Sequence, residues 1–356
     1  MEKKGRSRKK LLIWLISILI SIPLVLFPVT TVVVYEIIFW NRYETVQWAQ
    51  FSVDEFPGLA VERSDFESDG VLLAGYKYTK TGTDPKGVII LSHGLGGGHN
   101  TYMPIIDQIT SGGYYVFAYD ARGNDNSGGE DVEGLPQSLI DLDSAIEYVS
   151  RLTEYQGLPV GLFGHSWGGY AVGNVLNLHP EVKAAVIVAG FNRSEDMIAY
   201  HGEDKAGKAS LVMMPYLRLY ERLKFGSSFA DTSAVEGMGV TEAGILVVHS
   251  RDDETVPTRY GYDAVYAMYG ESDRFSFILY EDKGHEYPLF SDEAMTYREN
   301  LNAQYLVYIE STGQKNTDAV MAAYMEKNLD KMQCFEPNPQ LMDQTLALYD
   351  FYCSTQ

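Results

Sequence analysis

The chain is poor in cysteine, with only Cys334 and Cys353 among 356 residues. Two thiols exclude a disulfide-dense scaffold and any zinc site built from four thiolates. Basic residues are also scarce: 28 Lys and Arg stand against 48 Asp and Glu, a formal net charge of −20. This balance argues against nucleic acid as a partner, because Lys and Arg are needed to replace the counterions of the phosphates. With 46% hydrophobic residues and no low-complexity tract or internal repeat, the chain is instead typical of a folded protein.

The few basic residues are unevenly placed. Residues 1–10 hold six of them and one acidic residue, a local charge of +5 that leaves −25 on the remaining 346 residues. The next 25 residues, 11–35, contain no charge at all. As one helix they would span roughly 37 Å, more than the ~30 Å of a hydrocarbon core. We therefore predict a single transmembrane helix over 11–40, with the basic residues 1–10 in the cytoplasm and the acidic body outside the cell membrane.

A cleaved secretion signal is the alternative interpretation of this segment. The apolar run is about twice the length of a usual signal core, and no A-x-A-like cleavage site follows it, so a retained anchor is favoured. An extracytoplasmic body would also allow Cys334 and Cys353 to pair, although the sequence does not show whether they meet.

After a linker at 41–63, short apolar runs alternate with amphipathic helical stretches. The runs read as buried strands of a mostly parallel sheet: 71–78 (an edge strand), 88–91, 115–119, 160–163, 185–188, 245–248 and 275–279. This alternation predicts a doubly wound α/β domain over 64–314, with ligands at the carboxyl ends of the strands. Residues 192–240 interrupt it and read as a helical insertion. A helical extension is expected at 315–356, with helices around 317–332 and 339–352.

The strongest motif is Gly164-His165-Ser166-Trp167-Gly168, directly after one expected strand and before an expected helix. In this placement a sharp turn lifts the serine oxygen clear of the sheet, and glycines on both sides allow the crowded backbone. The motif predicts Ser166 as a nucleophile.

A serine nucleophile needs a base and a carboxylate that orients it, in the chain order Ser, acid, His. His285 follows the last expected strand and is the favoured base, because the other histidines flank a glycine loop, adjoin the serine, end a helix, lie in the insertion or precede the acid loop. The acid belongs to the loop after the preceding strand, where the residues alone leave Asp252 and Asp253 open.

The glycine-rich loop His93-Gly94-Leu95-Gly96-Gly97-Gly98 follows the strand at 88–91. Enzymes with such an elbow take one oxyanion donor from this loop and one from the residue after the nucleophile, here the backbone N–H groups of Leu95 and Trp167. A phosphate-binding G-x-G-x-x-G loop is the alternative, and it fails because His99 stands where the third glycine is needed.

These residues resemble the α/β-hydrolase superfamily, specifically its serine aminopeptidase-like and monoacylglycerol-lipase-like bacterial hydrolases. The resemblance covers roughly residues 64–314 and rests on DGVLLAGYKY, SHGLGGG, YDARGNDNSGG, GHSWGG, HSRDDETVP and DKGHE. It implies Asp253 as the acid, since the family pattern H-G-x-x-D-x-x-V-P aligns on Val256-Pro257. It also implies that the insertion at 192–240 is a cap over the site. Ser250 and Asp125 stand where the family usually has glycine.

The expected function is a membrane-anchored serine hydrolase that cleaves carboxylic esters, as a carboxylesterase, lysophospholipase or monoacylglycerol lipase does, and that needs no metal or cofactor. The substrate would be a small acyl ester, with a lipid-derived one suggested by the anchor. Apolar cap residues are candidates for an acyl pocket, although they could equally pack the cap on the body: Met213, Met214, Tyr216, Leu217 and Tyr220.

Two other functions remain open. A serine peptidase of the aminopeptidase type would bind a substrate amine through cap carboxylates, for which solvated surface charge is the simpler explanation: Glu195, Asp196, Glu203 and Asp204. A surface binding module without activity is the alternative from another class, and the complete set of Ser166, Asp253 and His285 speaks against it. The sequence leaves the oligomeric state open.

Overall fold

The computed structural model describes residues 2–82 and 84–354. Its main sheet has eight strands in the order β1-β4-β6-β5-β7-β8-β9-β10, and β2 and β3 form a separate hairpin. The strands are β1 Leu59–Arg63, β2 Phe66–Ser68, β3 Val71–Leu73, β4 Gly75–Lys80, β5 Val88–Ser92, β6 Tyr115–Tyr119, β7 Val160–His165, β8 Ala184–Val188, β9 Gly244–Ser250 and β10 Phe275–Tyr280. The predicted doubly wound, mostly parallel sheet is confirmed.

The central strands are parallel and apolar along their whole length. Every residue of β5, β8 and β9 is buried, as expected for strands that are covered on both faces by helices. In the register of β5 and β7, Leu91 is paired with Phe163 and Ser92 with Gly164, so these two strands end side by side. The loops after these two strands are therefore neighbours in space.

The edge of the sheet differs from the prediction. The expected edge strand at 71–78 is two strands, β3 and β4, because the backbone N–H of Ala74 leaves the ladder and donates to Ser127 Oγ at 2.8 Å. β4 is also not an edge, since it pairs antiparallel with both β1 and β6. β1 lies inside the stretch that the sequence assigned to the linker, where only one of its five residues is buried and apolar periodicity is weak.

Helices cover both faces of the sheet. The helices of the chain are α1 Glu2–Ser21, α2 Phe27–Phe39, α3 Met103–Ser111, α4 Gln137–Arg151, α5 Trp167–Val175, α6 Ser194–Ala206, α7 Met214–Phe225, α8 Ser227–Ala230, α9 Ala234–Val240, α10 Tyr262–Tyr269, α11 Asp292–Thr312, α12 Asp318–Asn328, α13 Lys331–Cys334 and α14 Pro339–Tyr352. One apolar cluster joins α4, α5, α9 and α10 to the sheet, and a second joins α3 and α14 to its other face. The predicted apolar stripe of α4, from Leu139 to Val149, is buried.

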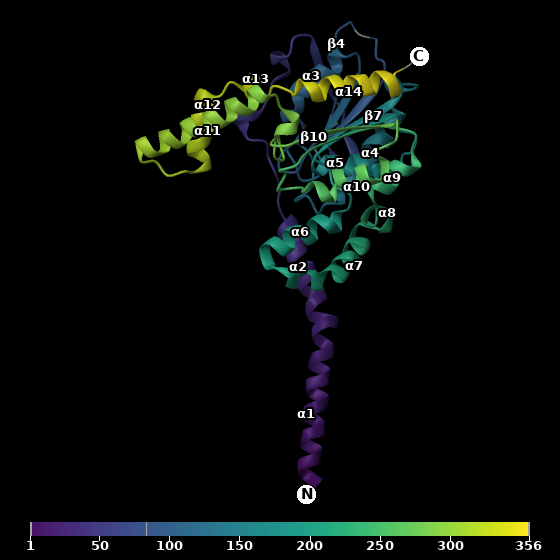
Figure 1. Ribbon diagram of the computed structural model, residues 1–356, viewed down its shortest axis with the longest axis vertical. Coiled ribbons are helices and arrows are strands. Elements are labelled where there is room, and N and C mark those ends of the chain that lie inside the picture. Colours follow the sequence, from purple (N-terminus) through teal and green to yellow (C-terminus); the bar gives the residue numbers. More distant parts are fainter. Residues whose placement is uncertain (1, 83, 355–356) are drawn as a thin grey trace.

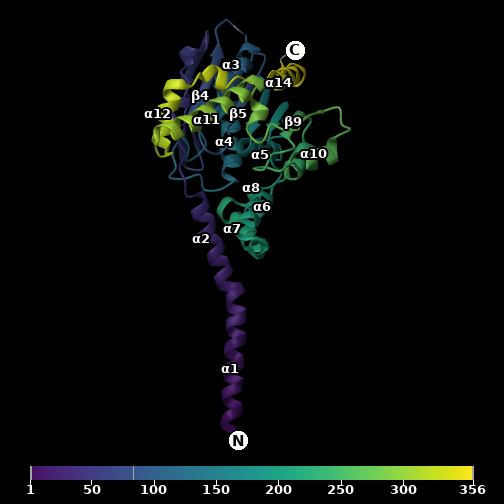
Figure 2. The ribbon, with the colours of Figure 1, turned by 60° about the vertical axis from the view of Figure 1, so that its left-hand side comes forward.

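The insertion between β8 and β9 is helical, with α6, the 3₁₀ segment η6 (Lys208–Met213), α7, α8 and α9. Figure 1 and Figure 2 place α6 and α7 at one end of the body, beside α2 and next to the point where the rod-like α1 departs. α6 and α7 therefore lie near the point where α1 joins the body.

The N-terminal segment is divided, where the sequence predicted a single transmembrane helix over 11–40. α1 ends at Ser21, a five-residue π-helix (η1, Ile22–Leu26) follows, and α2 begins at Phe27. Pro23 lies in η1 and Pro28 in the first turn of α2, and proline lacks the N–H that a continuous α-helix needs. Of the helices in residues 2–82 and 84–354, none combines the length and the apolar composition that crossing a membrane requires.

The C-terminal helices differ in how they contact the body. α14 matches the expected 339–352 and packs on the sheet, where Tyr349 donates a hydrogen bond to the carbonyl of Leu162 at 2.9 Å. The expected helix at 317–332 is two helices, α12 and α13, and Figure 1 shows α11 and α12 projecting from the body as an arm. Cys334 and Cys353 are both buried and both free thiols.

Candidate active site

Ser166 lies between β7 and α5 in a backbone conformation that is rare for a residue with a side chain, φ 55° and ψ −115°. Gly164 and Gly168 must be glycine because there is no room for a side chain at either position. A Cβ on Gly164 would lie 2.3 Å from the carbonyl oxygen of Gly168, and one on Gly168 would lie 2.0 Å from that of Ser92. The chain therefore makes the sharp strand-to-helix turn of a nucleophile elbow, with Ser166 at its tip.

His285 bridges the other two predicted residues. Its Nε2 lies 2.7 Å from Ser166 Oγ and its Nδ1 lies 2.8 Å from Asp253 Oδ2. Burial opposes ionisation of Asp253, but hydrogen bonds from His249 and His285 hold the pKa of this carboxyl well below its usual range. A charged Asp253 accepts the Nδ1–H of His285, which leaves Nε2 free to accept the hydroxyl proton of Ser166. The structure thus brings together the three residues that the sequence predicted.

The two neighbouring aspartates of the acid loop have different partners. Asp253 Oδ1 accepts the backbone N–H groups of Thr255 and Val256, at 2.9 and 2.8 Å, and its Oδ2 faces His285. Asp252 instead joins its loop to the loop that carries the histidine, since its Oδ1 accepts Ser250 Oγ at 2.6 Å and the N–H of Gly284 at 2.8 Å. The geometry therefore assigns the histidine contact to Asp253.

The two segments that carry the expected oxyanion donors adjoin the serine. A Cβ on Gly94 would lie 3.5 Å from Ser166 Cβ, which places the glycine loop against the nucleophile. Trp167 is the first residue of α5, so its N–H is one of the unpaired donors at a helix N-terminus. Within residues 2–82 and 84–354, neither this N–H nor that of Leu95 is hydrogen-bonded, and both are free to bind a negative oxygen.

The cap residues suggested for an acyl pocket have other neighbours. Leu217 is buried in the main apolar cluster, and Met214 packs against that cluster. Tyr216 contacts Phe27 with the two ring centres 6.2 Å apart, and Tyr220 contacts Tyr35 at 5.4 Å. Met213 is half-buried at the end of η6. Both tyrosines therefore pack on the N-terminal helix segment, which favours the packing interpretation for them.

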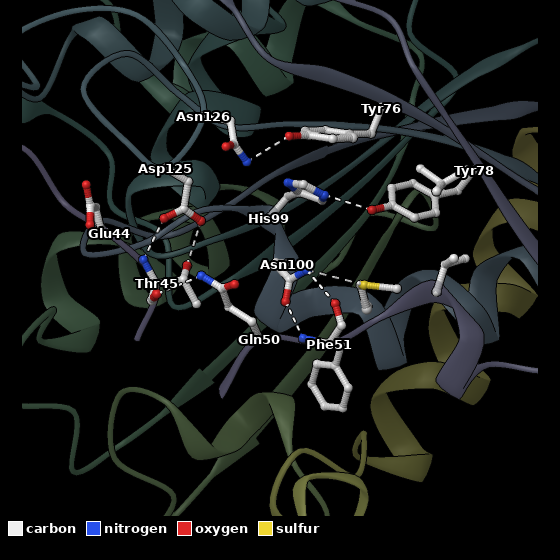
Figure 3. Close-up of a pocket in the computed structure, with 13 residues that line it drawn as sticks. Glu44, Thr45, Gln50, Phe51, Tyr76, Tyr78, His99, Asn100, Asp125 and Asn126 are labelled. Carbon is white, nitrogen blue, oxygen red and sulfur yellow. Dashed lines mark hydrogen bonds between the residues drawn. The ribbon is translucent and has the colours of Figure 1, made fainter. Parts of the chain in front are cut away.

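A cavity of about 460 Å³ lies at the far end of the glycine loop from Ser166. Figure 3 shows polar residues that line it: Thr45 Oγ1 donates to Asp125 Oδ2 at 2.7 Å, and His99 Nε2 lies 2.8 Å from the hydroxyl of Tyr78. Ser166, Asp253 and His285 do not line it. Asp125, which stands where the resemblance expects glycine, has φ 36° and shapes this cavity.

Two supporting residues were not assigned a role from the sequence. The Tyr102 hydroxyl accepts the N–H of Gly94 at 3.0 Å and lies 2.9 Å from His165 Nδ1, so it joins the glycine loop to the elbow. His249 Nε2 lies 3.2 Å from Asp253 Oδ2 and 2.7 Å from the carbonyl of Val256. His249 lies near the end of β9 and Asp253 in the loop that follows, so neither this contact nor the role of Tyr102 is indicated by a local sequence signal.

Part of the chain is similar to known proteins. Residues 83–242 match the family described as serine aminopeptidase, S33. A monoacylglycerol lipase of Mycolicibacterium smegmatis is 31% identical over 113 residues, which is 30% of this chain and 39% of that protein. A proline iminopeptidase of Clostridioides difficile is 36% identical over 95 residues, 26% of this chain and 31% of that protein. The matched part thus spans only about a third of the length of these two relatives.

The fold has relatives among solved structures. An esterase of Pyrococcus furiosus superposes with a TM-score of 0.54 at 15% sequence identity, covering 76% of this chain and 98% of the esterase. The fold and the strained serine after β7 define the class, an α/β protein with a nucleophile elbow. The family match over 83–242, together with the fold, supports an α/β-hydrolase, as the motifs suggested, and the relatives just described are a lipase, a peptidase and an esterase.

Proposed function

We propose that this protein is a serine hydrolase that cleaves carboxylic esters. The observation that carries the proposal is the position of His285, within hydrogen-bond distance of both Ser166 and Asp253. A serine hydroxyl is a weak nucleophile until an adjacent base takes its proton, and this geometry supplies the base and its orienting group. The same geometry argues against an inactive binding module, which would have no need for a strained serine.

The reaction has two half-reactions. Ser166 Oγ attacks the acyl carbonyl while His285 takes its proton, and the negative oxygen of the tetrahedral intermediate binds the N–H groups of Leu95 and Trp167. His285 then protonates the departing alcohol, which leaves an ester between the acyl group and Ser166. Water that is deprotonated by His285 attacks this ester and releases the carboxylic acid.

An ester substrate is supported by the monoacylglycerol lipase and esterase among the relatives, and a lipid-derived ester is our preferred candidate. A peptidase is the second candidate, since the matched family is described as serine aminopeptidase. Of the cap carboxylates that could hold a substrate amine, Glu195 is paired with Arg218 and Asp204 with Lys205. Asp196 and Glu203 have no such pair among the described residues, and both are half-buried. Asp196, in the first turn of α6, is the residue that we test first for amine binding.

Active-site labelling tests the proposal. Ser166 should react with a fluorophosphonate probe in the full chain, and the reaction should be lost in Ser166→Ala and strongly slowed in His285→Ala. Absence of Ser166-dependent labelling would contradict the hydrolase and favour a binding module. p-Nitrophenyl esters of graded chain length, compared with aminoacyl anilides, then separate an esterase from a peptidase. Faster cleavage of anilides that depends on Asp196 would favour the peptidase.

We further propose that residues 11–39 attach the protein to the cell membrane, with residues 1–10 in the cytoplasm and the body outside. Supporting this, large apolar side chains are exposed along α1, η1 and one side of α2, including Leu12, Trp14, Leu24, Val33 and Ile37. A run of exposed apolar side chains of this extent is unusual for a protein surface in water. The basic residues that precede the run support this orientation.

Cell fractionation tests the attachment. The full chain should stay in the membrane pellet through alkaline carbonate washing. Replacing Val25 and Val29 together by Lys should release it, because both lie near the middle of the apolar segment, where each Lys adds roughly 3 kcal/mol to the cost of insertion. Val61→Lys, on an exposed apolar position of β1, is the matched control and should leave the protein in the pellet. Release of the unmodified chain by carbonate alone would contradict the proposal.

A further inference from the structure

The N-terminal helix α2 is part of the body on one of its faces. Thr31, Tyr35 and Phe39, spaced four residues apart, are its buried residues. Tyr35 and Phe39 belong to the same apolar cluster as Trp167, the residue that follows the nucleophile. Figure 1 and Figure 2 both show α2 beside α7 of the cap. A segment far from the active site in sequence therefore reaches the core beneath it.

Polar contacts fix α2 to α7. The hydroxyl of Tyr35 donates to Glu221 Oε1 at 3.0 Å, inside the protein, and Ser194 Oγ donates to the other oxygen of this carboxylate at 3.0 Å. One residue further along α2, Glu36 accepts hydrogen bonds from Tyr220 and, at 2.8 Å, from Lys224. Each of the two helices thus supplies charged or polar partners to the other, and the pair has one defined register.

Tyr35 and Lys224 also contact the loop at 133–135. A Cβ on Gly134 would lie 2.0 Å from the Tyr35 hydroxyl, which shows that the tyrosine lies directly against this loop. Lys224 Nζ donates to the carbonyl of Glu133 at 3.0 Å. Both α2, through Tyr35, and α7, through Lys224, therefore contact this loop.

The loop in turn holds Trp167. The carbonyl of Leu135 accepts the indole N–H of Trp167 at 2.8 Å, and Ser138 Oγ donates to the Trp167 carbonyl at 3.2 Å. These two contacts fix both the side chain and the backbone of the residue whose N–H is the expected oxyanion donor. A shift of the loop would rotate this first residue of α5 and move the donor.

We propose, building on the function proposed above, that Tyr35 and Lys224 are positioning residues for the oxyanion donor at Trp167. They hold the loop at 133–135, and the loop holds the indole. An oxyanion donor must lie at the correct distance from the developing charge before reaction, so a small displacement lowers the rate of the chemical step more than it weakens substrate binding. In this proposal α2 is a structural part of the active site.

The test is a double-mutant cycle in the full chain, with p-nitrophenyl butyrate as substrate. Trp167→Phe keeps the backbone N–H but removes the indole bond to Leu135, and should lower kcat about tenfold with little change in KM. Tyr35→Phe should lower kcat several-fold, and the double variant should be no slower than Trp167→Phe, since both changes act through one loop. Tyr155→Phe is the matched control, because its buried hydroxyl has no hydrogen-bond partner among the described residues; it should leave kcat unchanged.

Hydrogen exchange gives a readout that does not need turnover. Tyr35→Phe should speed exchange of the backbone amides in segments 132–138 and 166–170, and Tyr155→Phe should not. Independent, multiplying effects of the two substitutions on kcat would overturn the inference, as would unchanged exchange in both segments. A wild-type protein without Ser166-dependent turnover would instead refute the proposed function, and the exchange data would still decide whether Tyr35 holds Trp167.

Discussion

Ser166 shows how strongly a single residue of this site depends on its neighbours. A side chain at φ 55° costs about 1–3 kcal/mol of backbone strain. The surrounding packing maintains this conformation, since the backbone of Gly168 lies so close to those of Gly164 and Ser92 that neither glycine has room for a Cβ. The strain is the consequence of exposing one hydroxyl at the end of β7, where His285 can reach it.

Asp253 and Asp252 offer a matched pair of substitutions at this scale. Asp253→Asn should lower kcat/KM by roughly 10³- to 10⁴-fold, because a neutral amide no longer stabilises the charged imidazole or its correct tautomer. Asp252→Asn keeps the oxygen that accepts Ser250 and Gly284, so its kcat/KM should stay within a few-fold of the wild type. Steady-state kinetics on p-nitrophenyl butyrate measures both. A larger loss in Asp252→Asn than in Asp253→Asn would contradict the assignment of the acid.

Among the elements, α7 stands out because it carries a buried carboxylate towards the N-terminal helix. Burial raises the pKa of Glu221 to about 7, against an ordinary value of 4.5. Hydrogen bonds from Ser194 and Tyr35 oppose this shift, while the charges of Glu195 and Asp231 add to it. Glu221 therefore keeps its proton in the folded protein at pH values where the unfolded chain has already lost it.

This difference makes the free energy of unfolding depend on pH. Between pH 4.5 and about 7 the folded state holds a proton that the unfolded state does not, so stability falls as the pH rises, by at most about 3 kcal/mol. Glu221→Gln, which resembles the protonated form, should remove this slope and be more stable than the wild type above pH 7. Urea unfolding at pH 5, 6 and 8 measures the free energy of unfolding of each variant. Glu242→Gln, on an exposed carboxylate, is the control. Parallel pH curves for the wild type and Glu221→Gln would be inconsistent with a buried, protonated Glu221.

At the scale of the whole molecule, charge is the dominant feature. The body carries −25 and the first ten residues +5, and the two are joined by the apolar segment. A strongly negative body repels anions that approach from solution and attracts cations, an effect that falls as salt shortens the Debye length. Neutral, zwitterionic or cationic esters are therefore expected to reach Ser166 faster than anionic ones.

Esters that share an acyl chain and differ only in the charge of the alcohol test this expectation. The ratio of kcat/KM for a choline ester to that for its anionic counterpart should be about tenfold higher at 20 mM than at 500 mM salt. A neutral ester, measured in parallel, should change little over this range. A ratio that is independent of salt would show that contacts in the site, and not the net charge, select the substrate.

Several features of this protein were determined by sequence alone. The apolar runs at 88–91, 160–163 and 245–248 are strands because such runs must be buried on both faces, and G-x-S-x-G marks the elbow because only glycine tolerates its close packing. α14 lies at the predicted residues because its Asn338 cap and apolar spacing are local signals.

Other features were decided by tertiary contacts. The sheet edge has β1 beside β4 because strand pairing joins segments whose own patterns are weak, and α2, the second part of the run at 11–40, has a buried face because it packs on the cap. Asp253 rather than Asp252 faces His285 because two loops distant in sequence interlock through Gly284. The local sequence pattern indicates whether a residue is buried. Which side chains meet is set by the packing of segments that are distant in sequence. Here that packing places α2 in the core beneath the nucleophile.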